Sequence, residues 1–209
     1  KEIKMGTQFK IGEHKLLCCS VLDNEAEEFI KDGFDMFYSD PPWDTGKVTY
    51  YSRLAGREPN SLPLLYNRIA YLISKYCRGY AFVEMGLGSV DSLMQILREN
   101  GLYILRKWDV FYGHGQGRRK YNLVCAAKRP ETINLEPPDI PGNVALPFWA
   151  ITNFSKERDI IFDSCCGLGG TGVACVKANR IFRGIEYVPK RFEKAVYNIE
   201  KEVKKHAHL

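Results

Sequence analysis

The 209-residue sequence has no long hydrophobic run, and no stretch reaches the ~18–20 apolar residues that a helix needs to cross a bilayer. Behind the charges of its first six residues, Lys1 to Gly6, there is no apolar core of the kind found in secretion signals. We therefore expect a protein that does not span a membrane, is not secreted and works in the cytoplasm.

The sequence also lacks the cysteine patterns of metal sites and disulfide frameworks. Its seven cysteines include no C-x-x-C pair and no Cys/His spacing typical of metal ligands. The adjacent pairs Cys18-Cys19 and Cys165-Cys166 cannot easily close local disulfides. We expect reduced, buried thiols and no metal ion.

A strong excess of one charge is missing as well. The 30 Lys and Arg residues face 25 Asp and Glu residues, which gives a formal net charge of +5. With 45% hydrophobic and 26% charged residues, the composition is that of a globular protein, and the length fits one domain over residues 1–209. The mild positive charge permits a nucleic-acid partner without requiring one.

Strand-like and helix-like segments alternate along the chain. Helical periodicity appears in Leu64–Tyr76, in a segment that Ser89 caps, and in a last segment that begins at Pro189. The alternation predicts a layered α/β fold, with a mostly parallel seven-stranded sheet covered by helices on both faces. The two strands that flank residues 113–120 are close enough for an antiparallel hairpin. The seven predicted strands are Lys15–Cys19, Asp35–Ser39, Tyr80–Glu84, Leu102–Trp108, Asn122–Lys128, Asp159–Asp163 and Phe182–Tyr187.

Two stretches interrupt this alternation. Residues 44–63 are polar and rich in aromatic residues, and we predict a loop there. Residues 130–147 are rich in proline and show no periodicity, so we predict an ordered segment that crosses the fold and is long enough to be functional.

A glycine-rich turn, Asp163–Gly172, follows one predicted strand and precedes a helix near Thr171. Such a turn either packs a helix on a sheet or lets the backbone approach a ligand closely. Glu186 ends the next strand, where a carboxylate can hold a ribose diol. The turn lacks the strict G-x-G-x-x-G pattern and any basic P-loop residue, which favours a cofactor that has a ribose but no pyrophosphate.

A second candidate site, Asp40-Pro41-Pro42-Trp43, ends the predicted strand Asp35–Ser39. The prolines fix an extended turn and have no N–H, so an acidic side chain, acceptor carbonyls and an aromatic ring come together. This set suits a planar amine, which offers two hydrogens and a ring to stack. The alternative is an ordinary loop entrance in which Trp43 fills the core.

Together, Asp40-Pro-Pro-Trp43 and the run from Phe162-Asp163 to Gly167 and Gly169 resemble motifs of the S-adenosylmethionine-dependent DNA amino-methyltransferases. Because Asp40-Pro-Pro-Trp43 comes first, the order resembles the circularly permuted β-class. The resemblance implies a Rossmann-like methyltransferase fold, S-adenosylmethionine as cofactor, and methylation of adenine N6 in DNA, as in restriction–modification systems. Cytosine N4, RNA adenine N6 and a non-catalytic nucleic-acid-binding subunit of a methyltransferase complex remain alternatives. A nucleoid-associated location inside the cell would fit this activity.

The resemblance also implies roles for individual residues. Asp40 and the Pro41 carbonyl would hold the target amine, with Pro42 fixing the turn and Trp43 stacking on the base. No cysteine nucleophile is required. Glu186 would hold the ribose hydroxyls. The other positions implied to bind the cofactor are Asp163, Cys165, Gly167, Gly169, Thr171 and Ser20, although the family often has Asp at the last position.

Basic and aromatic residues in two segments are candidates for contacts with nucleic acid. A solvated charged loop is the alternative for each segment. The chain has only residues 113–120 and 130–147 where this class usually carries a larger target-recognition domain. Specificity is therefore expected to be short or relaxed, or to come from a second copy in a homodimer or from a separate specificity subunit. The candidate residues are Lys47, Tyr50, Arg53, Arg57, His114, Arg118, Arg119 and Lys120.

Overall fold

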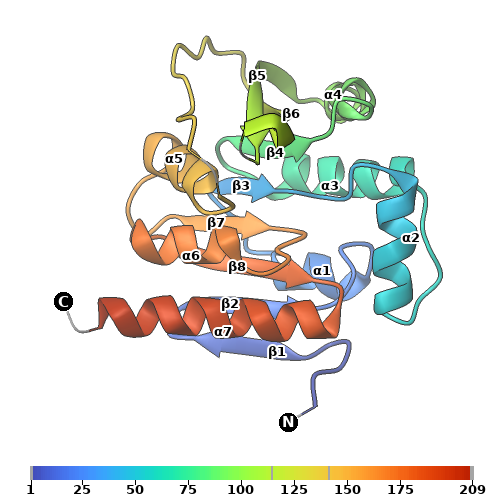
Figure 1. Cartoon of the computed structure of the whole chain (residues 1–209), viewed down its shortest axis with the longest axis vertical. Coiled ribbons are helices and arrows are strands. Elements are labelled where there is room, and N and C mark those ends of the chain that lie inside the picture. The colour runs from blue at the N-terminus through green and yellow to red at the C-terminus, as the bar shows by residue number, and fades with distance from the viewer. Residues whose placement is uncertain (1, 114, 141, 208–209) are drawn as a thin grey trace.

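The computed structural model describes residues 2–113, 115–140 and 142–207, which form one mixed sheet between two layers of helices (Figure 1). The eight strands that these residues contain lie in the order β1-β2-β8-β7-β3-β4-β6-β5. The five from β2 to β4 run parallel, whereas β1, β6 and β5 pair antiparallel at the two ends. The strands are β1 (Gln8–Ile11), β2 (His14–Cys18), β3 (Met36–Ser39), β4 (Ala81–Met85), β5 (Tyr103–Tyr112), β6 (Arg119–Ala127), β7 (Ile160–Asp163) and β8 (Ile181–Glu186).

The expected α/β fold is confirmed, and all seven predicted strands are present, but the number of strands was wrong. The additional strand is β1, a four-residue edge strand that pairs antiparallel with β2. It alternates polar and apolar residues over too few positions to be distinguished from a turn. Four of the seven strand pairings are parallel and three are antiparallel, so the sheet is mixed. The predicted hairpin is confirmed as β5–β6.

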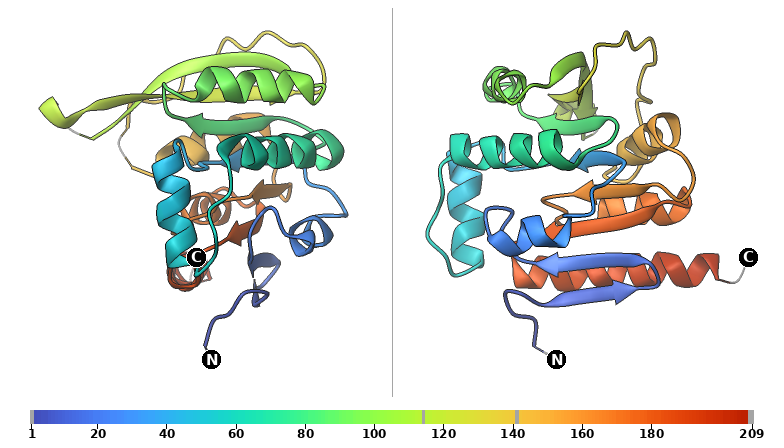
Figure 2. Two further views of the ribbon diagram at one scale, coloured as in Figure 1. Left: turned by 90° about the vertical axis from the view of Figure 1, so that its right-hand side faces the viewer. Right: turned by 180° about the vertical axis from the view of Figure 1, so that it is seen from behind.

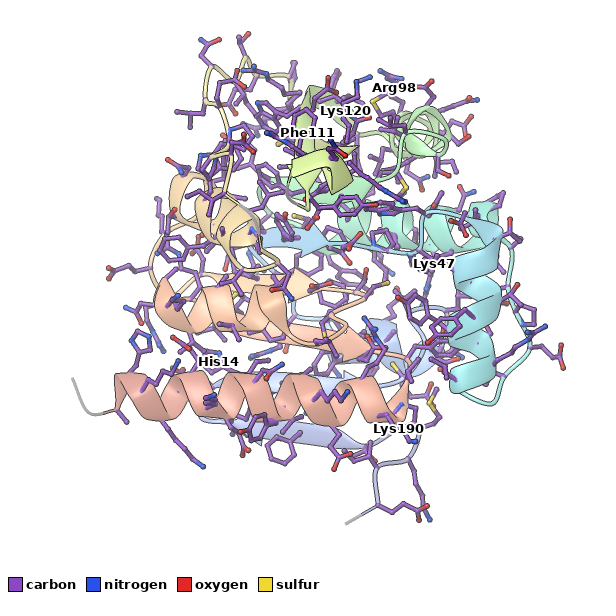
Figure 3. All side chains as sticks on the ribbon, viewed as in Figure 1. His14, Lys47, Arg98, Phe111, Lys120 and Lys190 are labelled. Atoms are coloured by element: carbon purple, nitrogen blue, oxygen red, sulfur yellow. The ribbon has the colours of Figure 1, made fainter. Side chains whose placement is uncertain are left out.

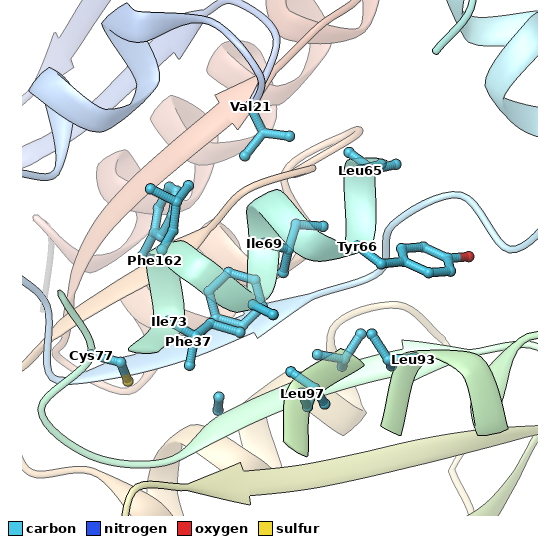
Figure 4. Close-up of a cluster of buried hydrophobic side chains, with 14 of the residues drawn as sticks. Val21, Phe37, Leu65, Tyr66, Ile69, Ile73, Cys77, Leu93, Leu97 and Phe162 are labelled. Carbon is cyan, nitrogen blue, oxygen red and sulfur yellow. The ribbon is translucent and has the colours of Figure 1, made fainter. Parts of the chain in front are cut away.

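Helices cover both faces of the sheet and enclose two hydrophobic cores (Figures 1 and 2). On one face, Leu65, Ile69 and Ile73 of α3 point toward Phe37 and Phe162 of the sheet (Figure 4). Their i, i+4, i+8 spacing places them on one side of the helix. This face carries α1 (Asn24–Phe29), α3 (Leu62–Tyr76) and α4 (Val90–Glu99), and the other carries α5 (Ala145–Phe154), α6 (Gly170–Lys177) and α7 (Pro189–His206).

The predicted loop over residues 44–63 was wrong in its first half, which forms α2 (Thr45–Leu54). The Asp44 side chain caps this helix by accepting a hydrogen bond from the Lys47 N–H at 2.8 Å. Only Val48 and Ser52 of α2 are buried, so the sequence carries no apolar period that would reveal a helix. The helix stands across the carboxyl ends of the parallel strands (Figure 1).

The proline-rich segment runs across the β5 end of the sheet before α5 begins at Ala145. Trp108 donates to the Leu135 carbonyl at 3.0 Å, and Arg106 donates to the Ile133 carbonyl at 2.7 Å and pairs with Glu136. These side chains of β5 hold residues 133–136 in place. No helix among the described residues is long and apolar enough to cross a membrane.

Candidate functional site

Each of four neighbouring parallel strands has an acidic residue at or next to its carboxyl end. In sheet order these are Glu186 on β8, Asp163 on β7, Asp40 directly after β3, and Glu84 near the end of β4. Ser39 pairs with Val83, and continuing this register by one residue brings Asp40 beside Glu84. The carboxyl edge of an open α/β sheet is where ligands bind. Two cavities open along this row.

The first cavity has a volume of about 270 Å³ and lies over β8, β7 and β3. Val48, Tyr51 and Ser52 of α2 form part of its wall, which gives this helix a place in the site. The glycine turn and the end of β8 form the opposite wall. The other polar side chains and the glycines that line this cavity are Ser20, Asp40, Asn60, Glu84, Asn143, Asp163, Ser164, Gly167, Gly170, Thr171, Glu186, Tyr187 and Arg191.

Asp163 holds the glycine turn in shape. One of its carboxylate oxygens accepts from the Cys165 N–H at 3.0 Å, and the other accepts from the Thr171 hydroxyl at 2.7 Å. Burial raises the pKa of Asp163 to about 6. Gly167 and Gly169 have φ values of +53° and +88°, which non-glycine residues rarely adopt. Gly167 lines the cavity, whereas Gly169 lies under α7, where an added Cβ would approach the Ala195 backbone to 3.1 Å.

Glu186 connects the loop that follows β7 to the loop that follows β8. Its carboxylate accepts from the Gly167 N–H at 2.7 Å and from the Val188 N–H at 3.0 Å. Only 6% of the residue is exposed, and burial raises its pKa to about 7. Arg191 lies 3.9 Å from the same carboxylate and stacks over Tyr51 of α2. A glycine turn, a strand-end carboxylate and a cation therefore share one wall of the first cavity.

Two further residues contribute to this cavity. Ser20 lines it and uses its backbone N–H to bind Asp23 at 2.9 Å. Tyr187 also lines it, and its hydroxyl is buried with no hydrogen-bond partner among the described residues. A buried polar atom without a partner costs free energy, so a ligand that supplies a partner would be favoured. Neither Tyr187 nor Arg191 stood out in the sequence, because no motif marks them.

The Asp40-Pro-Pro-Trp43 turn is held by protein donors on two of its carbonyls. The Tyr66 hydroxyl donates to the Pro42 carbonyl at 2.6 Å, and the Ser89 hydroxyl donates to the Trp43 carbonyl. Within the described part of the chain, no donor occupies the Pro41 carbonyl. The turn is therefore fixed while this one acceptor stays free.

Trp43 packs against Tyr121 and lies close to Gly86. Its ring stacks on Tyr121 with centroids 5.3 Å apart, and an added Cβ at Gly86 would lie 3.0 Å from the indole. The indole N–H donates to Asp40 at 2.8 Å. A base that stacks here would lie on Trp43 in place of Tyr121, or on the aromatic cluster that Trp43, Tyr112 and Tyr121 form.

The second cavity, of about 580 Å³, lies between Trp43, the β5–β6 hairpin and the proline-rich segment. Its aromatic wall consists of Trp43, Phe111, Tyr112 and Tyr121. Asp40, Glu84 and Asn143 line both cavities, so the two spaces meet at these three residues. An aromatic ring in the second cavity would bring its edge to the boundary with the first.

Glu84 is a third site residue that sequence reasoning missed, after Tyr187 and Arg191. It is the second-to-last residue of the otherwise apolar strand Ala81–Met85, and a charged residue in such a strand is the signal that was available. The Tyr38 hydroxyl donates to it at 2.9 Å. Burial is the largest cause that raises the pKa of Glu84 to about 7, and Asp163 adds to it. Enclosure by protein and then the Glu84 charge also raise the pKa of Asp40 well above its usual value.

The predicted nucleic-acid residues fall into two groups. Two of the arginines are engaged within the protein: Arg57 makes two 2.8 Å hydrogen bonds to Asp23, and Arg118 pairs with Asp139 at 2.7 Å. His114 lies outside the described residues. Figure 3 shows Lys47 on α2 below Phe111 and Lys120 on the hairpin. Of the other predicted residues, Lys120 pairs with Asp109 at 3.6 Å, and Lys47, Tyr50, Arg53 and Arg119 are exposed around the two cavities.

Several solved structures have the same fold. The M1.HpyAVI–SAM complex matches with a TM-score of 0.67 at 16% identity, covering 88% of this chain and 98% of that one. TTHA0409 of Thermus thermophilus, assigned as a DNA modification methylase and complexed with S-adenosyl-L-methionine, matches with 0.64 at 16% identity, covering 91% and 94%. The cytosine-N4-specific PvuII DNA methyltransferase matches with 0.64 at 12% identity, covering 92% and 90%. No family model and no curated protein matches the chain.

Proposed function

We propose that this protein transfers a methyl group from S-adenosylmethionine to the N6 amine of adenine in DNA. The observation that carries the proposal is that two cavities meet at Asp40, which follows β3 in the Asp-Pro-Pro-Trp turn. One cavity suits the cofactor and the other a flat base. Of the three similar solved structures, two are complexes with S-adenosylmethionine, one of these is assigned as a DNA modification methylase, and the third is a cytosine-N4-specific DNA methyltransferase, which supports this assignment.

The first cavity fits S-adenosylmethionine by the chemistry of its walls. Glu186 would accept the ribose hydroxyls, and Ser20 and Tyr187 lie where they would contact the nucleoside. Gly167 and Gly170 let the backbone approach the methionine part, beside Asp163 and Thr171. When bound, this cofactor supplies an electrophilic methyl group and a positive charge that the surrounding carboxylates stabilise.

Asp40 and Pro41 would prepare the amine for attack. The lone pair of an exocyclic amine is delocalised into the base, which makes the nitrogen a poor nucleophile. Hydrogen bonds from its two N–H groups to the Asp40 carboxylate and the free Pro41 carbonyl would localise the lone pair and aim it toward the first cavity. Positioning and electrostatic stabilisation then supply the rate enhancement, and no cysteine nucleophile takes part.

The β5–β6 hairpin would bring the nucleic acid to the second cavity. It projects beyond the body of the molecule (Figure 2) and contributes Phe111, Tyr112 and Arg118 to the cavity wall. Exposed Arg119 and Lys120 on it, with Lys47 and Arg53 on α2, would contact phosphates. A base in duplex DNA would have to leave the helix to enter the cavity. A second copy of the chain or a specificity subunit would supply further sequence recognition.

Adenine N6 is preferred to cytosine N4 because the turn begins with an acid, the commoner form in the adenine-specific members of the family that it resembles. The motif order, with Asp40-Pro-Pro-Trp43 before the glycine turn, supports the permuted β-class assignment. RNA is the second candidate substrate. The walls of the second cavity would contact the base, which is the same in RNA and DNA, and would not distinguish ribose from deoxyribose.

The test is transfer of labelled methyl from S-adenosylmethionine by the purified chain to duplex DNA, single-stranded DNA and RNA, followed by nucleoside mass spectrometry. We expect N6-methyldeoxyadenosine from the DNA samples. N4-methyldeoxycytidine would correct the base, and methylation of RNA alone would correct the polymer. No transfer to any of the three, with cofactor binding intact, would contradict the proposed function.

A further inference from the structure

The four strand-end carboxyls differ in what they can still bind. Asp163 and Glu186 are 3% and 6% exposed, and each of their carboxylate oxygens already accepts one hydrogen bond from the protein, which leaves one lone pair per oxygen for a ligand such as a ribose hydroxyl. Asp40 and Glu84, by contrast, retain accessible surface, and both line the two cavities. This accessible pair lies at the boundary where the edge of a bound base would lie.

Two carboxyls side by side resist losing both protons, because two negative charges at short range repel each other. Asp163 on β7 is a further acidic neighbour of both residues, whereas Asp109 on β5 lines the second cavity and pairs with Lys120 at 3.6 Å. The hydroxyls of Tyr38 on β3 and Tyr121 on β6 stabilise charge on Glu84. Arg191 on α7 and the Trp43 indole N–H stabilise charge on Asp40. A pair that holds one proton therefore presents one acceptor and one donor to a ligand at this boundary.

We propose that Asp40 and Glu84 together read the amidine edge of the base, with ionised Asp40 accepting from the amine and protonated Glu84 donating to the adjacent ring nitrogen. This inference rests on the proposed function. Adenine presents N6–H beside N1, and cytosine presents N4–H beside N3, so each offers a donor next to an acceptor. Guanine and thymine have a carbonyl oxygen beside a ring N–H, which reverses the pattern. Glu84 is thus a specificity-determining residue for amino bases.

The experiment uses the duplex that the wild-type chain methylates, with the target adenine replaced by 1-deazaadenine, which keeps the amine and lacks N1. If cytosine is the target, 3-deazacytosine takes its place. For the wild type, we expect kcat/KM to fall about tenfold or more on this replacement, since the Glu84 donor loses its partner. In Glu84→Ala, natural and deaza substrates should react with similar kcat/KM.

Glu84→Gln provides a second readout, because an amide donates at every pH. The wild-type kcat/KM should decline at alkaline pH as the shared proton is lost, and Glu84→Gln should lack this decline while it keeps the deaza penalty. Glu99→Gln, on the exposed face of α4, is the matched control and should behave as the wild type. An equal deaza penalty in wild type and Glu84→Ala, or an unchanged alkaline decline in Glu84→Gln, would overturn the inference. A wild type that methylates no nucleic acid would instead refute the proposed function.

Discussion

The four carboxyls at the sheet edge have different hydrogen-bond partners and exposure, and we expect them to have different roles for that reason. Asp163 and Glu186 bind backbone N–H groups and a hydroxyl of their own turns, so they shape the first cavity from within. Asp40 and Glu84 keep surface open to both cavities, so they are free to meet a ligand. A ligand at this sheet edge can bind most readily to the carboxylate oxygens that do not already accept hydrogen bonds from the protein.

Glu186→Gln should weaken S-adenosylmethionine binding about 10- to 100-fold, because a charged hydrogen-bond acceptor for the ribose is lost. The same change breaks one of the two backbone hydrogen bonds that Glu186 accepts. Since the pKa of Glu186 is about 7, wild-type binding should also weaken as the pH falls from about 8 to about 6. Calorimetric titration measures both effects.

Glu193→Gln, exposed on α7, is the matched control for this substitution and should bind as the wild type does. Equal affinities of Glu186→Gln and the wild type would contradict a role of Glu186 in holding the cofactor.

Sequence reasoning found three of the four carboxyls, and the difference has a physical reason. Asp40, Asp163 and Glu186 each stand at a strand end next to prolines or glycines, or at a spacing from them that carries chemical meaning. Glu84 has no such context, because its importance comes from sheet order, which places β4 beside β3. Pairing of strands distant in sequence cannot be read from a local pattern.

At the scale of elements, the glycine turn fits closely under α7. Gly169 adopts φ +88° and approaches the backbone of Ala195, whereas an added Cβ at Gly88 would meet nothing within 4 Å. The turn can take its path only because Gly169 has no side chain. The position of α7, and with it that of Arg191, depends on this contact.

Gly169→Ala should therefore destabilise the protein by about 1–3 kcal/mol, from the left-handed backbone and the crowded contact together. Urea unfolding followed by circular dichroism measures this change. Gly88→Ala should stay within about 0.5 kcal/mol of the wild type. Equal stability of the two variants would show that the turn does not need glycine at position 169.

The β5–β6 hairpin offers a test of the nucleic-acid surface. Arg119→Ala combined with Lys120→Ala should weaken DNA binding at about 50 mM salt and lower the salt-dependence slope by about one per lost phosphate contact. Fluorescence anisotropy over a salt series gives both numbers. Lys204→Ala, near the end of α7 away from the hairpin, should leave both unchanged (Figure 1). An unaltered slope in the double variant would place the DNA elsewhere.

The parallel strands and the amphipathic helices could be predicted from the sequence because burial imposes periods on it. The edge strand β1 and helix α2 could not, since both bury few residues. Tertiary contacts hold α2 instead, including Tyr51 against Arg191. Helix α2, which the sequence did not reveal, therefore forms part of the wall of the candidate site.

At the scale of the whole molecule, the row of carboxyls should affect stability. Burial raises the pKa values of Glu84 and Glu186 to about 7 and of Asp163 to about 6. The folded state therefore binds more protons than the unfolded state between about pH 4.5 and 7, and stability is lost as the pH rises through this range. His14 opposes the trend, because burial lowers its pKa, but it is a single group.

We expect the free energy of unfolding of the cofactor-free protein to fall by roughly 2 kcal/mol or more between about pH 5.5 and about pH 8. Urea unfolding at the two pH values measures this difference. Glu186→Gln should show a smaller decrease, because one of the titrating groups is gone. Stability that stays constant or rises over this range would contradict the electrostatic account of the site.

The central claim is that Asp40 serves methyl transfer at the meeting point of two cavities without holding the cofactor. Its most direct test compares Asp40→Ala with the wild type for methyl transfer to DNA and for S-adenosylmethionine affinity. Our account predicts that transfer falls by about a hundredfold or more, the usual cost of removing one stabilising group, while the cofactor Kd stays within about threefold. Transfer at the wild-type rate, or a loss of transfer fully explained by a loss of cofactor binding, would contradict it.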